Sequence, residues 1–542
     1  MKNYLDLKIG YSDAVNYSRR ENKQLFNEIF VKGQQLEKLL QPCVYFLIGG
    51  KGTGKTAYST FLSNNEYKET NSRSAFLSET EYRKFITLKE AEQLVFSDYV
   101  NVWNVLLLTL LSKQVKDGES SFTSMRNFAE YNKLDNAIDS FYQDGFTPEI
   151  MSAFNIIERS EVAANIIAER PIRKSEVSAK INEEVAHDEH KFQMNLMALE
   201  RRFKSVISKL KLQKNHILFI DGIDIRPKNL DYDIYLECIK GLAQSVWNLN
   251  NDFLSGINDS KGRLRIVLLL RPDIFSELGL QNLNNKLRDN SVLLDWRTSM
   301  ASYRESAIFH VADRLLAAQQ SDKPLNGGDC WDHYFPFKSG EEDSFESFLL
   351  LSLFRPRDII TLMNILQEYM NESHDDTGYV SQALFDDPQI RSKYSDYLLG
   401  EIKDYLLFYH SEKDYSTFLK FFEFLNGKHS FSYDEYIYAY EQFAKYVEAR
   451  NIDVPEYMET SGNLLQFLYD LDVIGYTIKQ SDGSNQSHWS FRDRNYSDLA
   501  PKIPEGCDYS IQLGLRKALN IGKSLRIKRS SIKTRRLKHH KS

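Results

Sequence analysis

The stretch that most constrains the fold is residues 43–62, with the sequence CVYFLIGGKGTGKTAYSTFL. The five apolar residues VYFLI have the character of a buried strand, and a helical pattern follows the glycines. Gly49, Gly50, Gly52 and Gly54 lack a Cβ atom, so the loop can take left-handed conformations and approach a ligand closely. A strand, a glycine loop and a helix in this order predict an α/β fold with a parallel sheet.

The loop has the spacing G-x-x-x-x-G-K-[ST] of a phosphate-binding P-loop, and it ends in Lys55 and Thr56. Its N–H groups should turn toward one concave point, where the N-terminus of the next helix adds partial positive charge. We expect Lys55 to reach the β- and γ-phosphates and Thr56 to hold Mg²⁺. The alternative is a glycine-rich turn with a solvated lysine. The predicted nucleotide-binding residues of this loop are Gly49, Gly50, Lys51, Gly52, Thr53, Gly54, Lys55, Thr56 and Ala57.

Hydrolysis also needs a carboxylate that organises the metal and a group that positions water. The stretch ILFIDGID offers both, because an apolar strand ends at Asp221 and a second carboxylate follows at Asp224. We expect Asp221 to hold Mg²⁺ directly or through water, and Asp224 to orient or polarise the attacking water. Strands often end in Asp-Gly simply as a turn signal, which is the alternative interpretation.

Three arginines are further candidates for the site. Arg271 follows the predicted strand RIVLLL, where it would sense the γ-phosphate or form a salt bridge with Asp273. Arg288 precedes the last core strand, where it would reach a neighbouring subunit's nucleotide or remain a solvated surface charge. Arg357 begins the helix after the core and would close a lid on the γ-phosphate. Its alternative is a surface charge loosely partnered by Asp358.

ATP is favoured over GTP. The letters NKLD at Asn132 to Asp135 match the guanine motif N-K-x-D, but they precede the Asp221 strand and follow no apolar strand. Asp224 also stands where the D-x-x-G partner motif needs glycine. The expected cofactors are therefore ATP and Mg²⁺.

The remaining pattern predicts a sheet covered on both faces by helices, because the strands RSAFLSET (73–80), HILFID (216–221), RIVLLL (265–270) and SVLLDW (291–296) alternate with helical segments. The stretch RPRDIITLMNILQEYM is an amphipathic helix with Pro356 at an early position. Residues 415–493 follow the order helix, helix, helix, hairpin, which is that of a winged-helix domain. The predicted domains are an N-terminal helical segment (1–42), a P-loop core (43–298) with a helical insertion at about 85–213, a helical lid (299–400), a winged helix (401–510) and a basic tail (511–542).

Charge is unevenly distributed along the chain. The net charge is −6, yet residues 516–542 carry eleven Lys and Arg and no acid, so the rest sums to −17. We expect this tail to be disordered. It would serve either solubility and weak adhesion to polyanions or non-specific contact with nucleic-acid phosphates. The candidate recognition helix at 462–473 has no Lys or Arg, so a structural or protein-contact role is favoured for it over DNA reading.

Other features suit a cytoplasmic protein that does not enter a membrane. The four cysteines lie far apart without a C-x-x-C pair, which argues against zinc or a disulfide framework. The N-terminus lacks the apolar region of a signal peptide. The longest apolar run, VLLLTLL at 105–111, is too short to span a bilayer.

The segments GGKGTGKTA, ILFIDGIDIRP, LLLRPDIF, LLDW and RPRDIITLMN resemble a bacterial family of P-loop ATPases of the AAA+ and STAND branches, near origin-recognition-type ATPases. The closing FRDRNYSDLAPKIPEGCDYSIQLGLRKALNI also resembles that family's winged-helix end, and the likeness covers most of the chain outside 110–190. It implies nucleotide binding by Lys55 and Thr56, and metal and water roles for Asp221 and Asp224. Arg271 departs from the polar sensor, often asparagine, that AAA+ proteins carry there. The resemblance suggests stress or antiviral defence, or a DNA-associated switch.

The leading hypothesis is an ATP-binding and slowly hydrolysing switch that changes its homo-oligomeric state or its contact with an effector protein. One alternative is a DNA-binding ATPase of the replication or transposition-regulator type. Another is a scaffold that binds ATP without turnover.

Overall fold

The computed structural model describes residues 1–76, 96–119, 128–143, 189–223, 226, 232–279, 282–320, 327–340, 342–479, 483 and 485–522. The chain forms two compact units. The first is Met1–Ile390 with Ser490–Pro501, and the second is Arg391–Trp489 with the residues from Lys502 onward. Within the described residues, no helix is both long enough and apolar enough to cross a membrane.

A five-stranded, all-parallel sheet forms the centre of the first unit, which confirms the predicted α/β class. Its order is β2-β3-β4-β1-β5, so the strand before the glycine loop lies between β4 and β5. Every residue of β4 is buried, as a strand covered on both faces should be. The strands are β1 (Phe46–Ile48), β2 (Thr70–Phe76), β3 (Asn215–Asp221), β4 (Leu264–Leu270) and β5 (Ser291–Leu293).

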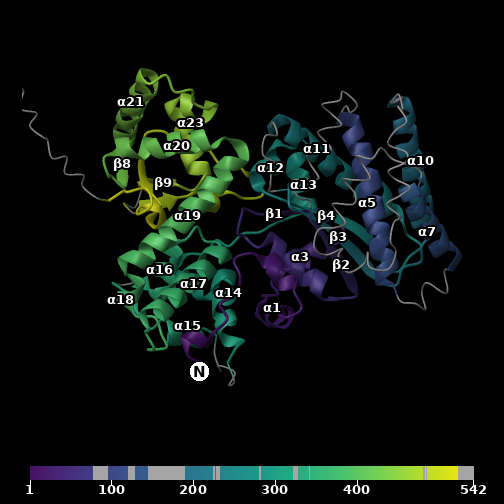
Figure 1. Ribbon diagram of the computed structural model, residues 1–542, viewed down its shortest axis with the longest axis horizontal. Coiled ribbons are helices and arrows are strands. Elements are labelled where there is room, and N and C mark those ends of the chain that lie inside the picture. The colour runs from purple at the N-terminus through teal and green to yellow at the C-terminus, as the bar shows by residue number, and fades with distance from the viewer. Residues whose placement is uncertain are drawn as a thin grey trace, which may run out of the picture. The chain divides into compact units, whose positions relative to one another are not determined.

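Helices cover this sheet. Three of them, α5, α7 and α10, pack side by side as the insertion between β2 and β3 (Figure 1). The part of 85–213 that the structure describes contains no strand. The predicted buried run at 105–111 lies in α5, which also packs against α11. The helices of this layer are α3 (Lys55–Asn64), α5 (Phe96–Gly118), α7 (Phe128–Gln143), α10 (Glu189–Ile207), α11 (Tyr232–Asn248), α12 (Pro272–Glu277) and α13 (Leu283–Asn290).

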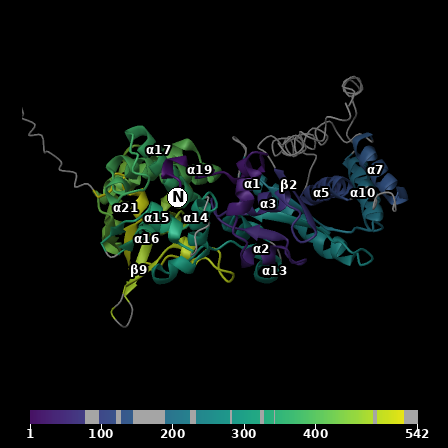
Figure 2. The same ribbon diagram turned by 90° about the horizontal axis from the view of Figure 1, so that it is seen from below.

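Residues 1–42 are less helical than expected. They form two 3₁₀ turns, η1 (Tyr4–Asp6) and η2 (Ala14–Ser18), and two short helices, α1 (Lys23–Ile29) and α2 (Gln34–Leu39). Helix α1 lies against α3, as Figure 2 also shows. Between η1 and η2 the backbone bonds to side chains from far along the chain: the Lys8 N–H and carbonyl pair with the Gln319 amide, and the Gly10 carbonyl accepts from Asn364.

A helical region follows the sheet in the first unit. Its helix α17 begins with Pro356 at the first helical position, as predicted. The N-terminus packs on this region: the Tyr4 hydroxyl donates a 2.9 Å hydrogen bond to the Met363 carbonyl, and the Gln367 amide donates to the Tyr4 and Leu7 carbonyls. The elements are α14 (Ala307–Ala317), α15 (Asp329–Tyr334), β6 (Lys338–Ser339), β7 (Glu342–Asp343), α16 (Ser344–Leu351), α17 (Pro356–Ser373) and α18 (Gln382–Phe385).

The second unit contains the predicted helices and hairpin. Strands β9 and β10 pair in antiparallel register, with Tyr476 opposite His488. Two further strands, β8 and β11, complete a four-stranded sheet of order β10-β9-β11-β8, which the sequence pattern did not reveal. The elements are α19 (Pro388–Tyr409), α20 (Glu412–Phe421), β8 (Ser430–Ser432), α21 (Tyr433–Ala449), α22 (Glu456–Glu459), α23 (Ser461–Asp470), β9 (Ile474–Lys479), β10 (Asn485–His488) and β11 (Asp508–Ile511).

The first part of the expected basic tail is folded. Leu515, Leu519 and Ile521 are buried, and the Gly522 N–H donates a 2.8 Å hydrogen bond to the Gly427 carbonyl. Burial of these apolar side chains anchors the chain as far as Gly522. The rest of the predicted tail, 523–542, lies outside the described residues.

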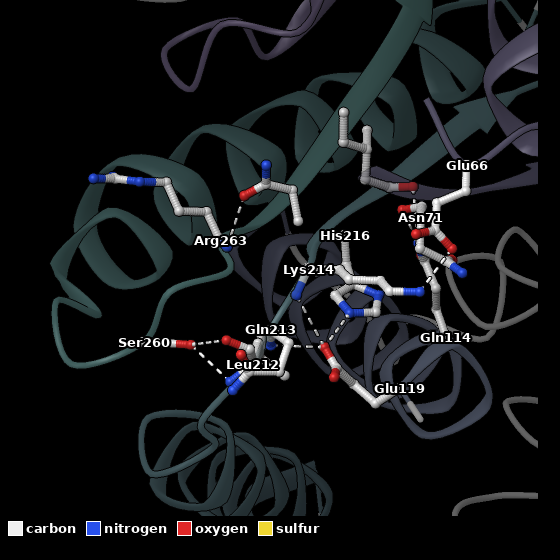
Figure 3. A network of polar contacts seen from close by, with 12 residues as sticks. Glu66, Asn71, Gln114, Glu119, Leu212, Gln213, Lys214, His216, Ser260 and Arg263 are labelled. Atoms are coloured by element: carbon white, nitrogen blue, oxygen red, sulfur yellow. Dashed lines mark hydrogen bonds and ion pairs between the residues drawn. The ribbon is translucent and has the colours of Figure 1, made fainter. Parts of the chain in front are cut away.

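A buried polar network ties the amino end of β3 to the end of α5 (Figure 3). Glu119 and His216 have side chains only 1% and 0% exposed, and Oε1 of Glu119 lies 3.0 Å from Nε2 of His216. The same oxygen accepts hydrogen bonds from the N–H groups of Gln213 and Lys214. Burial opposes ionisation of Glu119, but these donors together hold its pKa below the usual range.

Candidate functional site

The glycine loop lies at the carboxyl end of β1, which is held on both sides. The Gly49 N–H donates to the Leu270 carbonyl over 3.0 Å, and the Leu294 N–H donates to the Ile48 carbonyl over 2.7 Å. Within the loop, Gly52 has φ +82° and Gly54 has φ +94°, a backbone conformation that favours glycine. Helix α3 begins immediately afterwards at Lys55, so its N-terminus faces the loop.

Two carbonyls of this loop are held from outside. A guanidinium nitrogen of Arg355 donates to the Lys51 carbonyl over 3.1 Å, and the Trp296 indole donates to the Thr53 carbonyl over 2.8 Å. In a planar trans peptide the N–H points opposite to the C=O. Anchoring these two carbonyls therefore orients the N–H groups of Gly52 and Gly54 the other way.

The sequence pattern did not single out Arg355 or Trp296. Arg355 is fixed by Asp358, whose carboxylate is completely buried and accepts two 2.9 Å hydrogen bonds from the guanidinium. A bidentate pair of this kind holds the guanidinium plane in one orientation. The signal in the sequence was the spacing in RPRD, where an aspartate three residues after an arginine falls within the same helical turn.

The predicted phosphate-binding lysine is folded onto the loop. Lys55 is 6% exposed, and its ammonium group donates hydrogen bonds to the carbonyls of Gly49 (2.9 Å) and Gly50 (3.3 Å). These contacts place the positive charge inside the curve of the loop. An anion bound there would exchange neutral carbonyl partners for charged oxygens, which form stronger hydrogen bonds with an ammonium group.

Thr56 and Asp221 meet although 165 residues separate them. The Thr56 hydroxyl donates a 2.7 Å hydrogen bond to Oδ2 of Asp221, and Oδ1 of the same carboxylate accepts from the Gly222 N–H, also over 2.7 Å. Asp221 is 5% exposed at the carboxyl end of β3. A hydroxyl and a carboxylate are oxygen ligands that suit Mg²⁺, so the two predicted metal-binding residues fit that ion.

Within the described residues, no group of three or more His, Cys, Asp or Glu is gathered to hold a metal. Mg²⁺ sites need no such cage, because the ion keeps several waters and takes further oxygens from a substrate's phosphates. The donor set of Thr56 and Asp221 is thus of the kind that works together with a bound phosphate.

A cavity of about 160 Å³ opens beside the loop. A cavity of about 150 Å³ holds a benzene-sized ring, so this one can accept part of a planar base. Its apolar wall comes from the N-terminal segment, where the rings of Tyr17 and Phe26 stack at 4.4 Å. Burial raises the pKa of Tyr58 in this wall to about 12. Its main lining residues are Tyr17, Phe26, Ile29, Phe30, Gly50, Lys51, Gly52, Gly54, Lys55, Thr56, Ala57, Tyr58, Trp296, Leu315, Pro356 and Arg357.

One of the candidate arginines lines this cavity, and another lies at the carboxyl edge of the sheet. Arg357 lines it and donates a 2.9 Å hydrogen bond to the Ser12 carbonyl. Arg271 is 2% exposed at the end of β4, next to β1, and forms a 2.8 Å ion pair with Asp273. That ion pair is the alternative role considered for Arg271, and it holds the guanidinium at the carboxyl edge of the sheet.

Two predicted residues are not part of this arrangement. Arg288 is exposed near the end of α13, just before β5 begins, and so lies at the amino edge of the sheet, opposite the loop. It does not join the site of its own chain, and its expected reach into a neighbouring subunit stays a prediction. Asp224 lies outside the described residues. The NKLD letters fall within α7, where Asp135 pairs with Lys116.

A comparison with models of known protein families finds no match to the chain, and a search of curated proteins finds none either. The resemblance to P-loop ATPases therefore rests on the sequence motifs alone.

Proposed function

We propose that this chain is an ATP-binding and ATP-hydrolysing switch with a P-loop core. The proposal rests chiefly on the 2.7 Å contact between Thr56, at the start of the helix after the glycine loop, and Asp221, at the end of β3. A hydroxyl from one motif and a carboxylate from the other, joined at the carboxyl edge of a parallel sheet, suit a metal–phosphate site.

The strand order supports the same proposal. Strand β4 lies between β1, which leads into the loop, and β3, which ends in Asp221. One additional strand between these two is the order expected of the P-loop class that the sequence resembles. Parallel sheets bind ligands outside the carboxyl ends of their strands, and both motifs lie at that edge.

ATP hydrolysis would proceed by in-line attack of water on the γ-phosphate. The oriented N–H groups of Gly52 and Gly54 and the ammonium group of Lys55 would bind the phosphate oxygens. Thr56 and Asp221 would hold Mg²⁺, which when bound neutralises charge on the β- and γ-phosphates. Asp224 would orient the water. The base would stack against the aromatic wall formed around Tyr17 and Phe26.

The second unit fits the partner-binding end of such a switch. Its helices α20, α21 and α23 precede the β9–β10 hairpin, an order that matches a winged helix. The exposed positions of α23 include no Lys or Arg, which favours a protein contact over DNA reading. Nucleotide state would then change homo-oligomerisation or binding of an effector, in a context such as stress or antiviral defence.

Calorimetry with ATP, ADP and GTP, followed by phosphate-release assays, tests the proposal. We expect binding of both adenine nucleotides, Mg²⁺-dependent hydrolysis of ATP, and loss of both in Lys55→Ala. Lys23→Ala is a suitable control, because Lys23 is an exposed residue of α1 and does not line the cavity. Unchanged ATP affinity in Lys55→Ala would contradict the proposal.

A further inference from the structure

The chain between two strands of the second unit belongs to the first unit. Strands β10 and β11 lie in the four-stranded sheet of the second unit, yet Ser490–Pro501 between them is part of the first. This segment, called here the return segment, begins with the short helix α24 (Ser490–Asp493). Its side chains Ser490 and Leu499 are buried.

The return segment contacts the residue that precedes Arg355. The ring of Phe491 stacks on the ring of Phe354, with 5.3 Å between the ring centroids. The guanidinium of Arg492 also lies over the Phe354 ring, 4.4 Å from its centroid. Phe354 has φ +54°, a left-handed conformation that strains a residue with a Cβ atom. Such a conformation persists only where the surroundings enforce it, and the stacked ring and the cation contribute to that enforcement.

The return segment also contacts the residue after Trp296. A guanidinium nitrogen of Arg297 donates a 2.8 Å hydrogen bond to the Arg492 carbonyl. Further along, the Tyr496 hydroxyl accepts from the Leu293 N–H over 2.9 Å, and Lys38 lies over the Tyr496 ring at 4.4 Å. Strand β5 and the turn that carries Trp296 are therefore each held by the return segment, at Leu293 and at Arg297.

These contacts converge on the glycine loop. Arg355 and Trp296 hold the loop carbonyls of Lys51 and Thr53. Each of these two residues is the sequence neighbour of a residue that Arg492 touches, Phe354 on one side and Arg297 on the other. Arg492 thus acts on both anchors of the loop, once through its side chain and once through its carbonyl.

We propose that Arg492 is a positioning residue for the nucleotide site, and that the return segment couples nucleotide binding at the glycine loop to the second unit. This inference rests on the proposed function. Fixing both loop carbonyls pre-orients the N–H groups that face the phosphates, so loss of the Arg492 side chain should weaken nucleotide binding. By thermodynamic reciprocity, bound nucleotide stabilises the return segment, and with it the points where β10 and β11 leave and re-enter the second unit.

The test uses the full chain and ADP as the probe. Arg492→Ala should bind ADP roughly five- to tenfold more weakly than the wild type, within the range usual for coupled sites. Arg492→Lys should recover most of the affinity, because it restores a cation over Phe354. Ser497→Ala is the matched control, since Ser497 is an exposed residue of the same segment. Tyr496→Phe provides a second, milder variant should Arg492→Ala unfold.

Hydrogen exchange supplies a readout that a purely structural role would leave unchanged. In the wild type, ADP should slow amide exchange across 490–501 at least threefold, and in Arg492→Ala this protection should be lost even at saturating ADP. The coupling would be overturned if Arg492→Ala bound ADP within twofold of Ser497→Ala, or if ADP did not slow amide exchange in 490–501. Neither result would contradict ATP binding. A wild-type chain that binds neither ADP nor ATP would instead overturn the proposed function, and the coupling with it.

Discussion

The Thr56 hydroxyl donates a 2.7 Å hydrogen bond to Oδ2 of Asp221, across 165 residues of chain. In Asp221→Asn, an uncharged amide replaces the carboxylate that would hold Mg²⁺. We expect Mg²⁺-dependent ATP turnover to fall by roughly 10²–10³-fold, while ADP binding measured in EDTA stays within a few-fold of wild type. Phosphate release and calorimetry measure the two effects. Asp289→Asn, at an exposed site on α13, should change neither. Full turnover in Asp221→Asn would remove this residue from the metal site.

The glycine loop allows a matched comparison between a left-handed glycine, Gly54, and a glycine outside that region, Gly50. Gly54→Ala places a Cβ on a backbone with φ +94°, which costs about 1–2 kcal/mol of local strain. Gly50→Ala meets nothing closer than 3.6 Å, and its φ is not in the left-handed region. We expect Gly54→Ala to weaken ADP binding about tenfold and Gly50→Ala to weaken it less than threefold, as measured by calorimetry. Equal affinities would mean that the loop takes another shape when it binds nucleotide.

Asp224→Asn separates binding from chemistry. Because the predicted role is to position water, the variant should bind ATP normally and hydrolyse it roughly 10²–10⁴-fold more slowly. Single-turnover phosphate release, paired with calorimetry, measures both quantities. Hydrolysis at the wild-type rate would mean that another residue orients the water, and loss of ATP binding would indicate a metal or structural role.

Nucleic-acid affinity, if the chain has any, should depend on residues after Gly522. These carry nine of the eleven Lys and Arg found after Leu515. Leu515, Leu519 and Ile521, which precede them, are buried in the fold. Ending the chain after Gly522 should abolish most binding to duplex DNA and leave basal ATP hydrolysis unchanged. Because such contacts go to phosphates, binding should not depend on DNA sequence. It should weaken with salt, with a slope of about −0.9 per phosphate contacted when the logarithm of the binding constant is plotted against that of the salt concentration.

Fluorescence anisotropy with two unrelated duplexes at two salt concentrations checks this expectation. Full affinity in the shortened chain, or a strong preference for one duplex, would assign the binding to the four-stranded sheet and helices of the second unit instead.

The Glu119–His216 pair predicts a pH dependence of stability. Since its hydrogen-bond partners hold the pKa of Glu119 below its ordinary value despite burial, the carboxylate's contribution to stability is present above that ordinary pKa and is lost as pH falls through the lowered pKa. Glu119→Ala should cost about 1–3 kcal/mol at neutral pH, because it leaves the buried His216 ring and two backbone N–H groups without their partner, and should flatten the acid limb of the stability curve. Urea titrations between pH 3 and 7 measure both.

Glu66→Ala is the control for that pair. Glu66 forms a 2.7 Å ion pair with Lys214 close to the same network, but both side chains are about one-third to one-half exposed. An exposed pair contributes about 0–1 kcal/mol, so this variant should stay near wild type at every pH. Equal losses in the two variants would show that the buried contacts of Glu119 contribute no more to stability than the exposed Glu66 pair.

The sequence pattern was informative where local chemistry decides the structure. The glycine loop, the long buried strands and the helix that starts at Pro356 follow from apolar runs, missing side chains and a fixed proline φ. The short strands β8 and β11 were missed, because three or four residues carry too little periodicity and their pairing partners lie far along the chain. Strand β5 ends at Leu293, earlier than predicted, and Trp296 beyond it turns to the Thr53 carbonyl.

The side chains that hold the glycine loop were also not predictable from the local sequence. Arg355 and Arg357 stand two residues apart in RPRD, and composition alone cannot say which of them reaches the loop. The choice depends on the left-handed backbone of Phe354 and on Asp358, which together direct Arg355 to the Lys51 carbonyl while Arg357 lines the cavity. Tertiary packing from residues more than a hundred positions away fixes that backbone, so it leaves no local trace.

The hydrogen bond from Tyr4 to the Met363 carbonyl spans 359 residues, so it can form only long after Tyr4 itself has been synthesised. A ribosome adds about 5–20 residues per second, so Tyr4 waits roughly 20–70 s before its partner has been made. Tyr4, Leu7 and Ile9 are all buried in the folded protein. During that interval the residues of α17 that Tyr4 packs against have not yet been synthesised. Until then these side chains are exposed to water, so this part of the chain can complete its packing only after helix α17 has been synthesised.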